Sequence, residues 1–220
     1  MSLTRGLVLD VANQLGGTMP SIVTLHDYSR HGNDGAMANV IWTQTAAGLW
    51  VMNFNGTTAT VNCGNDASVD IGLGLTIEAW VNFDNLFDIT RGDWDTTISH
   101  ISYYAGFNPG TGRLMLALAG IANFEGIKDS WAALTWFHIV CTHDGALTNH
   151  YVNGALDRSQ AGVGSITQNP ANNLHIGSYD PTWDWFEGRI AMPRVRNYAL
   201  TAAQVRARYH STKWLFGVAS

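Results

Sequence analysis

Two segments of the chain combine aromatic and acidic side chains in a way that could bind a sugar. Aromatic rings can stack on the C–H faces of a sugar ring, while carboxylates accept hydrogen bonds from its hydroxyls. The candidate ligand-binding residues are Asp93, Trp94, Asp95, Tyr103 and Tyr104 in the first segment and Asp180, Trp183, Asp184 and Trp185 in the second. The alternative is that these aromatics pack at the ends of the fold, with either Trp183 or Trp185 filling a core position.

The carboxylates do not form a pattern that predicts catalysis. A glycosidase needs two carboxyl groups about 5–10 Å apart across the scissile bond. The chain has only three glutamates, Glu78, Glu125 and Glu187, and none lies in a Glu-x-Asp-x-x-Glu pattern. Glu78 and Asp84 share one predicted strand, but six residues of strand separate them by about 20 Å. We therefore predict no catalytic residues and no enzymatic activity.

The cysteines and histidines also lack the spacing of a metal or redox site. Cys63 and Cys141 are the only cysteines, and each lies in a strand-like run. Two buried thiols are the favoured interpretation, with a disulfide between them as the alternative. The eight histidines include no closely spaced pair that resembles a strong metal site. Histidines held by hydrogen bonds within strands are the simpler interpretation.

Composition favours one domain with a large core and argues against nucleic acid as a partner. The chain has 220 residues, of which 46% are hydrophobic and 13% are charged, and its net charge is −5. Only Lys128 and Lys213 are lysines, so a surface that tracks phosphates is not expected. We predict a single domain over residues 1–220, with a core at about 5–209 and an apolar tail at 210–220.

The N-terminus lacks the basic region, apolar run and cleavage site of a signal peptide. No apolar run approaches the roughly 20 residues of a membrane-spanning helix. The sequence therefore predicts synthesis in the cytoplasm and is compatible with release as part of a virion or another extracellular assembly. The final location is not determined by these observations.

Short alternating segments separated by turn residues predict an all-β fold. The clearest strand is 75–83, where Leu75, Ile77, Ala79, Val81 and Phe83 share one face, which we assign to the core. The opposite face carries glutamate and tryptophan, so it is either a groove floor or a second covered surface. Asn-Gly pairs at 55–56 and 153–154 predict two hairpins. This pattern is typical of a two-sheet antiparallel sandwich or jelly roll.

One short helix is predicted near the C-terminus. Thr201 and Gln204 have the spacing of a capping box, and Leu200, Val205 and Tyr209 could attach the helix to the sandwich. The tail beyond it ends in an apolar group formed by Trp214, Leu215 and Phe216. This group either packs back on the domain or forms a homo-oligomer contact with another subunit.

Seven motifs in order resemble those of the laminin G-like group of concanavalin A-like lectin/glucanase jelly rolls. They are RHGNDG (30–35), MNFNGTTATV (52–61), LTIEAWV (75–81), TWFHIVCTHDG (135–145), YVNG (151–154), LHIGS (174–178) and FEGRI…RVRNYALTAAQV (186–205). The resemblance spans about residues 5–209. It implies two curved antiparallel sheets, one of them concave, and a function that varies among members.

The resemblance also implies a structural calcium site beside the GNDG turn. The matching positions are Asp10, Asp27, Asn33, Asp34 and Gly35, whereas the acidic residue that relatives place after the GxI motif is Ala191 here. Calcium takes six to eight oxygen ligands, so the loss of one carboxylate weakens this expectation. The alternative is that Asp27 and Asp34 cap turns through local hydrogen bonds.

Together these features favour a non-catalytic recognition domain that binds a glycan through the two aromatic, Asp-rich loops. The alternative is a structural or adhesion component of a virion or another surface assembly, acting through oligomerisation. The identity of the glycan or protein partner is not determined by the sequence.

Overall fold

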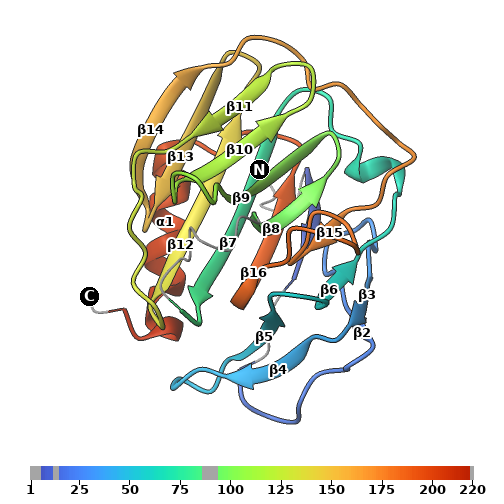
Figure 1. The fold of residues 1–220 in the computed structure, drawn as a ribbon, viewed down its shortest axis with the longest axis vertical. Coiled ribbons are helices and arrows are strands. Elements are labelled where there is room, and N and C mark those ends of the chain that lie inside the picture. The colour runs from blue at the N-terminus through green and yellow to red at the C-terminus, as the bar shows by residue number, and fades with distance from the viewer. Residues whose placement is uncertain (1–5, 12–14, 86–93, 219–220) are drawn as a thin grey trace.

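The computed structural model describes residues 6–11, 15–85 and 94–218, which form two antiparallel sheets packed face to face (Figure 1). The first sheet contains, in spatial order, β14 (Ala155–Ala161), β13 (Leu147–Val152), β12 (Trp136–His143), β7 (Leu75–Phe83), β16 (Glu187–Arg196), β5 (Trp50–Asn55) and β4 (Ile41–Gln44), while β1 (Leu7–Asp10) pairs with β16. The second sheet contains β11 (Ala122–Glu125), β10 (Leu114–Leu118), β9 (Tyr103–Phe107), β8 (Asp95–His100), β15 (His175–Ile176), β6 (Thr60–Asn62), β3 (Gly35–Ala38) and β2 (Thr24–Leu25). The predicted fold class is confirmed.

The core lies between the two sheets, and the alternation of β7 assigns its inner face as predicted. Leu75, Ile77, Ala79, Val81 and Phe83 are all buried in the main hydrophobic cluster. Because successive side chains of a strand point to opposite faces, the even-numbered residues of β7 lie on the outer face of the first sheet. They are buried as well, so another element must cover that face.

The C-terminal helix provides this cover (Figure 1). Helix α1 (Ala202–Thr212) begins at Thr201 with the predicted capping box, in which Thr201 Oγ1 accepts from Gln204 N at 3.3 Å. Val205 packs with Val140 and Tyr151 of the first sheet. The Tyr209 ring stacks on Trp80 with 5.8 Å between ring centres. The outer face of β7 is therefore a second covered surface and not a groove floor.

The apolar tail packs back on its own domain. It forms a short 3₁₀-helix, η2 (Lys213–Phe216), and the Phe216 ring stacks on Trp80 at 4.2 Å between centres. Leu215 and Phe216 are buried, whereas Trp214 is exposed. Of the two alternatives for this group, packing back on the domain is the one that the structure shows for Leu215 and Phe216, which leaves Trp214 as the exposed member for an oligomer contact.

A buried charge cluster joins α1 to the first sheet. Glu78 of β7 accepts from Arg196 Nη1 at 2.8 Å and from Arg208 Nε at 2.6 Å, and its Oε1 lies 3.2 Å from His138 Nε2. Arg196 belongs to β16, Arg208 to α1 and His138 to β12, so the carboxylate of Glu78 connects four elements, including its own strand β7. Only 3% of the Glu78 side chain is exposed.

One predicted hairpin forms and the other does not. The turn at Asn153 and Gly154, both with positive φ, joins β13 to β14 as expected. By contrast, β5 and β6 do not pair with each other, because they belong to different sheets. Asn55 Oδ1 accepts from the backbone N–H groups of residues 57, 58 and 59, and this turn carries the chain across the sandwich.

The two cysteines are free and buried, as the favoured interpretation predicted. Burial raises the pKa of both thiols, which keeps them in the unreactive protonated form. None of the helices in the described ranges has the length and apolar character that crossing a membrane requires.

Candidate functional site

The second predicted loop lies on the outer face of the second sheet. Inner positions of neighbouring strands, such as Ile98 and Ile176, belong to the core. The adjacent outer row therefore contains Ser99 and, beside it, Tyr104. Ser99 Oγ lies 2.8 Å from the Ser178 carbonyl oxygen and 2.6 Å from that of Tyr179. This serine anchors the start of the 178–185 loop to the sheet.

Asp180 organises the rest of this loop. Its Oδ1 accepts from Thr182 N at 2.7 Å and from Thr182 Oγ1 at 2.6 Å, and its Oδ2 accepts from Trp183 Nε1 at 2.8 Å. The indole N–H is therefore satisfied within the loop, while 61% of Trp183 remains exposed. Partial burial raises the pKa of Asp180, but the hydrogen bonds from Thr182 and Trp183 outweigh it and hold the pKa below its ordinary value.

Aromatic contacts connect this loop to the first predicted segment. The Tyr104 ring meets Tyr179 edge to face, with 5.3 Å between centres, and meets Trp94 in the same manner at 6.3 Å. The backbone N–H of Trp94 donates to Asp184 Oδ1 at 3.3 Å. We call the resulting group the aromatic site; it consists of Trp94, Tyr104, Tyr179, Asp180, Trp183 and Asp184.

The tyrosines of the aromatic site stay protonated at physiological pH. Burial, together with the nearby Tyr179 and Asp184, raises the pKa of Tyr104 to about 12. Burial also raises the pKa of Tyr179, with added effects of Asp180 and Asp184. Both phenols can therefore donate a hydrogen bond, while the aspartates accept. A ligand with several hydroxyl groups can use both kinds of partner.

Four residues of the sequence prediction are not part of this arrangement. Tyr103 is fully buried, and its hydroxyl donates to the Val69 carbonyl oxygen at 2.8 Å. Asp95 is also buried and accepts from Glu187 N at 3.1 Å. Because both side chains are inside the protein, they are not available to a ligand and their assignment is corrected. Asp93 lies outside the described residues, and Trp185 is partly buried beside the exposed Trp183.

The sequence analysis did not identify the polar residues beneath the loop. Ser99 is one of these residues, and Thr60 is another. Thr60 Oγ1 lies 2.6 Å from Ser178 Oγ, and both of these hydroxyls are buried. The alternation of β8 could have indicated an outward Ser99, but the contact between residues 60 and 178 depends on the order of the strands. These hydroxyls hold the loop and do not reach solvent.

The turn expected to bind calcium is instead closed by hydrogen bonds. Asp27 accepts from the backbone N–H of Asp10 at 2.9 Å and of Asn33 at 2.8 Å, and also from Ser29. Asp34 Oδ1 accepts from Asp27 N at 2.8 Å. This arrangement corresponds to the alternative in which both aspartates cap the turn.

The remaining ligand candidates also have protein partners. The Arg194 guanidinium donates to Asp10 at 2.5 Å, which places a positive charge beside the first acidic candidate. The side-chain amide of Asn33 donates to the Val8 carbonyl oxygen at 2.8 Å. Gly35 pairs with Leu25 between β3 and β2, and Ala191 is a buried apolar residue. These residues do not fit a calcium ion, since a bound ion would compete with Arg194 and with the donors to Asp27.

We expect millimolar Ca²⁺ to shift the melting temperature by less than about 1 °C relative to EDTA, which corresponds to less than ~0.5 kcal/mol. An ion that binds only the folded state would raise stability in proportion to its occupancy. Thermal unfolding in EDTA, in CaCl₂ and in MgCl₂ at matched ionic strength measures this. A saturable rise specific to Ca²⁺ would contradict the closed turn.

The three glutamates are all engaged in contacts within the protein. Glu78 is buried beneath α1 as described above. Glu125 accepts from Asn108 and lies 3.3 Å from Thr111 Oγ1, and Glu187 accepts from Asn85 Nδ2 at 3.3 Å. Glu78 and Asp84 each pair with an arginine, Arg196 and Arg189 respectively. These pairs stabilise strands and helix and do not face one another across a cleft.

A family model described as the concanavalin A-like lectin/glucanases superfamily matches residues 55–206. Among solved structures, the binding domain of Paraclostridial Mosquitocidal Protein 1 is 14% identical, with a TM-score of 0.68 over 96% of this chain and 53% of that chain. The receptor binding domain of botulinum neurotoxin type G is 21% identical, with a TM-score of 0.62 over 94% of this chain and 51% of that chain.

A third similar structure matches almost over its full length. Domain 4 of AbnA, a GH43 extracellular arabinanase from Geobacillus stearothermophilus, was solved in complex with arabinotriose. It is 16% identical, with a TM-score of 0.64 over 83% of this chain and 91% of that chain. At these identities the likeness shows the fold. The chain spans about half the length of the two toxin domains, and no curated protein sequence matches it.

Proposed function

Because the chain belongs to the concanavalin A-like lectin/glucanases superfamily, we propose that it is a non-catalytic recognition domain that binds a glycan at the aromatic site. The observation that carries this proposal is the geometry of Trp183. Its indole N–H is held by Asp180 while most of its surface is exposed. An aromatic ring that is oriented in advance can stack on a sugar with little loss of side-chain entropy.

Two features of the similar structures support a recognition role. The toxin structures are named as binding domains, and the arabinanase domain was solved with an oligosaccharide. The glutamates of this chain are held by contacts within the protein, which supports binding without catalysis. Arabinotriose is therefore a reasonable first probe, together with a panel of other neutral oligosaccharides.

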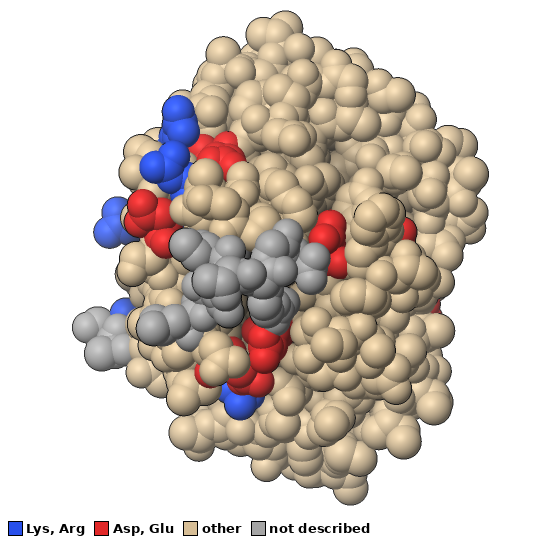
Figure 2. Space-filling view, in the orientation of Figure 1, with Lys and Arg blue, Asp and Glu red and all other residues tan. Residues whose placement is uncertain are grey.

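The charge of the site favours neutral over acidic sugars. Asp180 and Asp184 both belong to the aromatic site, and over β8 and β15 the molecular surface shows acidic but no basic residues (Figure 2). Among the residues that the structure describes there, none is a cation that could pair with the carboxylate or sulfate of an acidic sugar placed near these aspartates. We expect uronate-containing oligosaccharides to bind more weakly than neutral ones of the same length.

Trp183→Ala is expected to weaken binding of a neutral oligosaccharide by roughly 3- to 10-fold, the effect of losing one stacking contact. The measurement is titration calorimetry with the best ligand of the panel. Trp214→Ala is the matched control, since Trp214 is 58% exposed and lies on η2, away from the aromatic site. If no saccharide binds, or if both variants bind like the wild type, the aromatic site does not recognise glycans.

A further inference from the structure

A buried histidine lies beneath the loop of the aromatic site. His175 belongs to β15, and because the next residue, Ile176, is part of the core, the His175 side chain points to the outer face of the second sheet. On this face it is paired with Ser99 of β8, which anchors the start of the 178–185 loop. Only 5% of His175 is exposed. An ionisable side chain that is covered to this extent loses most of its hydration, which disfavours its charged form.

Hydroxyl groups connect His175 to the loop above it. Its Nδ1 lies 3.5 Å from Thr60 Oγ1, which in turn lies 2.6 Å from Ser178 Oγ. On the other side, Ser99 Oγ donates to the carbonyl oxygens of Ser178 and Tyr179. Thr60 and Ser99 belong to the strands that flank β15, so the start of the loop is held over the imidazole from both sides. The position of the loop is therefore coupled to the state of His175.

Burial is the largest influence on the charge of His175. It lowers the pKa of this residue below its ordinary value of 6.5, while the negative charge of Asp180 acts in the opposite direction and His100 of β8 adds to the lowering. The imidazole is therefore mainly neutral at physiological pH. The other side chains that the structure places around it, from both flanking strands and from the loop, carry no charge at this pH; they are Thr60, Asn62, Ser99, Ser178 and Tyr179.

We propose that His175 makes the aromatic site sensitive to pH, because protonation of the imidazole releases the 178–185 loop from the sheet and weakens ligand binding. This inference rests on the proposed binding of a glycan at that site. Its physical basis is linkage: a group that binds a proton less readily while it is covered favours, once protonated, the state in which it is uncovered. For His175 the covered state is fully favoured above pH 6.5, the ordinary pKa of histidine, and this advantage declines as the pH falls below that value.

Release of the loop changes the orientation of the ring that stacks on the sugar. Trp183 is held by Asp180, and a protonated His175 attracts the same carboxylate. Asp180 itself stays ionised between about pH 7 and pH 5, the range in which histidine titrates. Burial raises the pKa of Asp180, but the hydrogen bonds from Thr182 and Trp183 hold it below its ordinary value of 3.8. A loss of binding in this range is therefore assigned to the histidine and not to the aspartate.

The test compares the wild type with His175→Gln between about pH 7.5 and pH 5. Titration calorimetry measures the affinity for arabinotriose and for the other neutral oligosaccharides of the panel. NMR follows the indole N–H of Trp183, which is identified by its loss in Trp183→Phe. In the wild type the affinity is expected to fall at least about fivefold toward low pH, and the indole signal should shift in the same range. In His175→Gln, which has no imidazole to protonate, the affinity should change by less than about twofold and the indole signal should stay constant.

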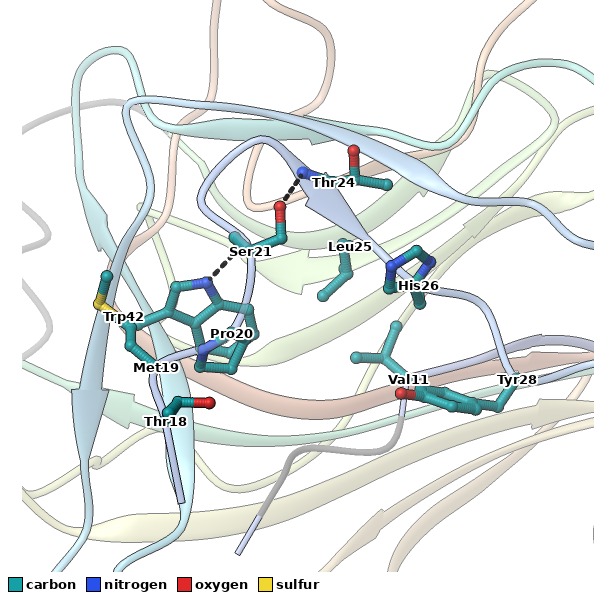
Figure 3. Close-up of a pocket in the computed structure, with 10 residues that line it drawn as sticks. All are labelled: Val11, Thr18, Met19, Pro20, Ser21, Thr24, Leu25, His26, Tyr28 and Trp42. Atoms are coloured by element: carbon teal, nitrogen blue, oxygen red, sulfur yellow. Dashed lines mark hydrogen bonds between the residues drawn. The ribbon is translucent and has the colours of Figure 1, made fainter. Parts of the chain in front are cut away.

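His26→Gln is the matched control. His26 is an exposed histidine whose Nδ1 lies 3.3 Å from a carboxylate oxygen of Asp34. It follows β2, which is separated from β15 by β6 and β3, and it lines a pocket with Tyr28 and Trp42 that includes no residue of the aromatic site (Figure 3). This variant is expected to show the same pH dependence as the wild type.

A measurement on the wild type alone guards against a folding defect in His175→Gln. Linkage is reciprocal, so a sugar that binds the closed loop must lower the pKa of His175 further. The imidazole resonances of His175 report this pKa with and without sugar. A pKa that bound sugar leaves unchanged or raises would overturn the proposal.

The outcomes separate this inference from the proposed function. If a sugar binds equally well at both ends of the pH range, or if His175→Gln loses affinity as the wild type does, the pH switch is overturned while glycan binding stands. If no sugar binds, the proposed function fails and the indole signal decides. A signal that titrates only when His175 is present supports the release of the loop, and a signal that does not titrate overturns it.

Discussion

Glu78→Gln is expected to lower the free energy of unfolding by about 3–5 kcal/mol, the range found when one partner of a buried ion pair is removed. The carboxylate accepts hydrogen bonds from Arg196 and Arg208 and contacts His138. Glutamine keeps the size of the side chain but removes its charge. The guanidinium of Arg196, which is 2% exposed, would then remain buried without its partner. Urea denaturation followed by tryptophan fluorescence measures the change.

The effect of this substitution should depend on pH in a defined direction. Burial alone raises the pKa of Glu78, but the hydrogen bond from His138 and the charges of Arg194 and Arg196 outweigh it and hold the pKa well below its ordinary value of 4.5. The stabilisation is therefore complete above pH 4.5 and is lost as the pH falls through the lowered value. The difference between wild type and variant should stay constant above about pH 5 and shrink in more acidic solution.

The control for this experiment is Asp129→Asn, which removes an acidic residue at an exposed position. A surface substitution of this kind is expected to change stability by less than about 0.5 kcal/mol. If Glu78→Gln has an equally small effect, Arg194, Arg196 and Arg208 are solvated well enough that their charges do not need the Glu78 carboxylate as a partner. In that case the cluster would not be what attaches α1 to the sheet.

Phe216→Ala is expected to destabilise the protein by about 3–5 kcal/mol, as for other buried phenylalanines. The ring of Phe216 contacts Trp80 at 4.2 Å and Trp136 at 4.8 Å between ring centres. Its loss leaves a cavity on the outer face of the first sheet, at the end of α1. Hydrogen exchange should show faster exchange of α1 (Ala202–Thr212) than of the core strands, because the helix depends on this contact.

Trp214→Ala is the control for Phe216→Ala. It tests whether the loss of stability comes from the packing of a buried ring or only from the loss of an apolar side chain in the tail. Trp214 neighbours Phe216 in the sequence, but it is exposed and its Nε1 donates to the Ser211 carbonyl oxygen at 3.1 Å. We expect a change below about 1 kcal/mol. Equal destabilisation by both substitutions would show that the tail does not pack as described.

Local features of the fold could be predicted from the sequence. The alternation of 75–83, the capping box at Thr201 and Gln204 and the turn at 153–154 depend on residues close together in the chain. The prediction of a hairpin at 55–56 was wrong, because the pairing of two strands depends on more than the residues of the turn between them. An Asn-Gly pair predicts a tight turn, but it does not determine whether the next strand joins the same sheet or crosses to the other one.

The aromatic site could be predicted only in part. The adjacent tyrosines 103 and 104 look alike in the sequence, yet the strand β9 points the first into the core and the second outward. Their assignment required the register of β9 against β8, which no local pattern provides.

Three features followed from the sequence by itself. They are the two loops rich in tryptophan and aspartate, the lack of two carboxylates with catalytic spacing, and the two-sheet architecture. Only the tertiary structure decided which of these side chains reach solvent and which polar groups find partners inside the protein. Trp183 is exposed and held by Asp180, whereas Asp10 pairs with Arg194, which is 184 residues away in the chain. The physical reason is that burial and charge pairing depend on contacts between distant segments, which the order of the residues does not specify.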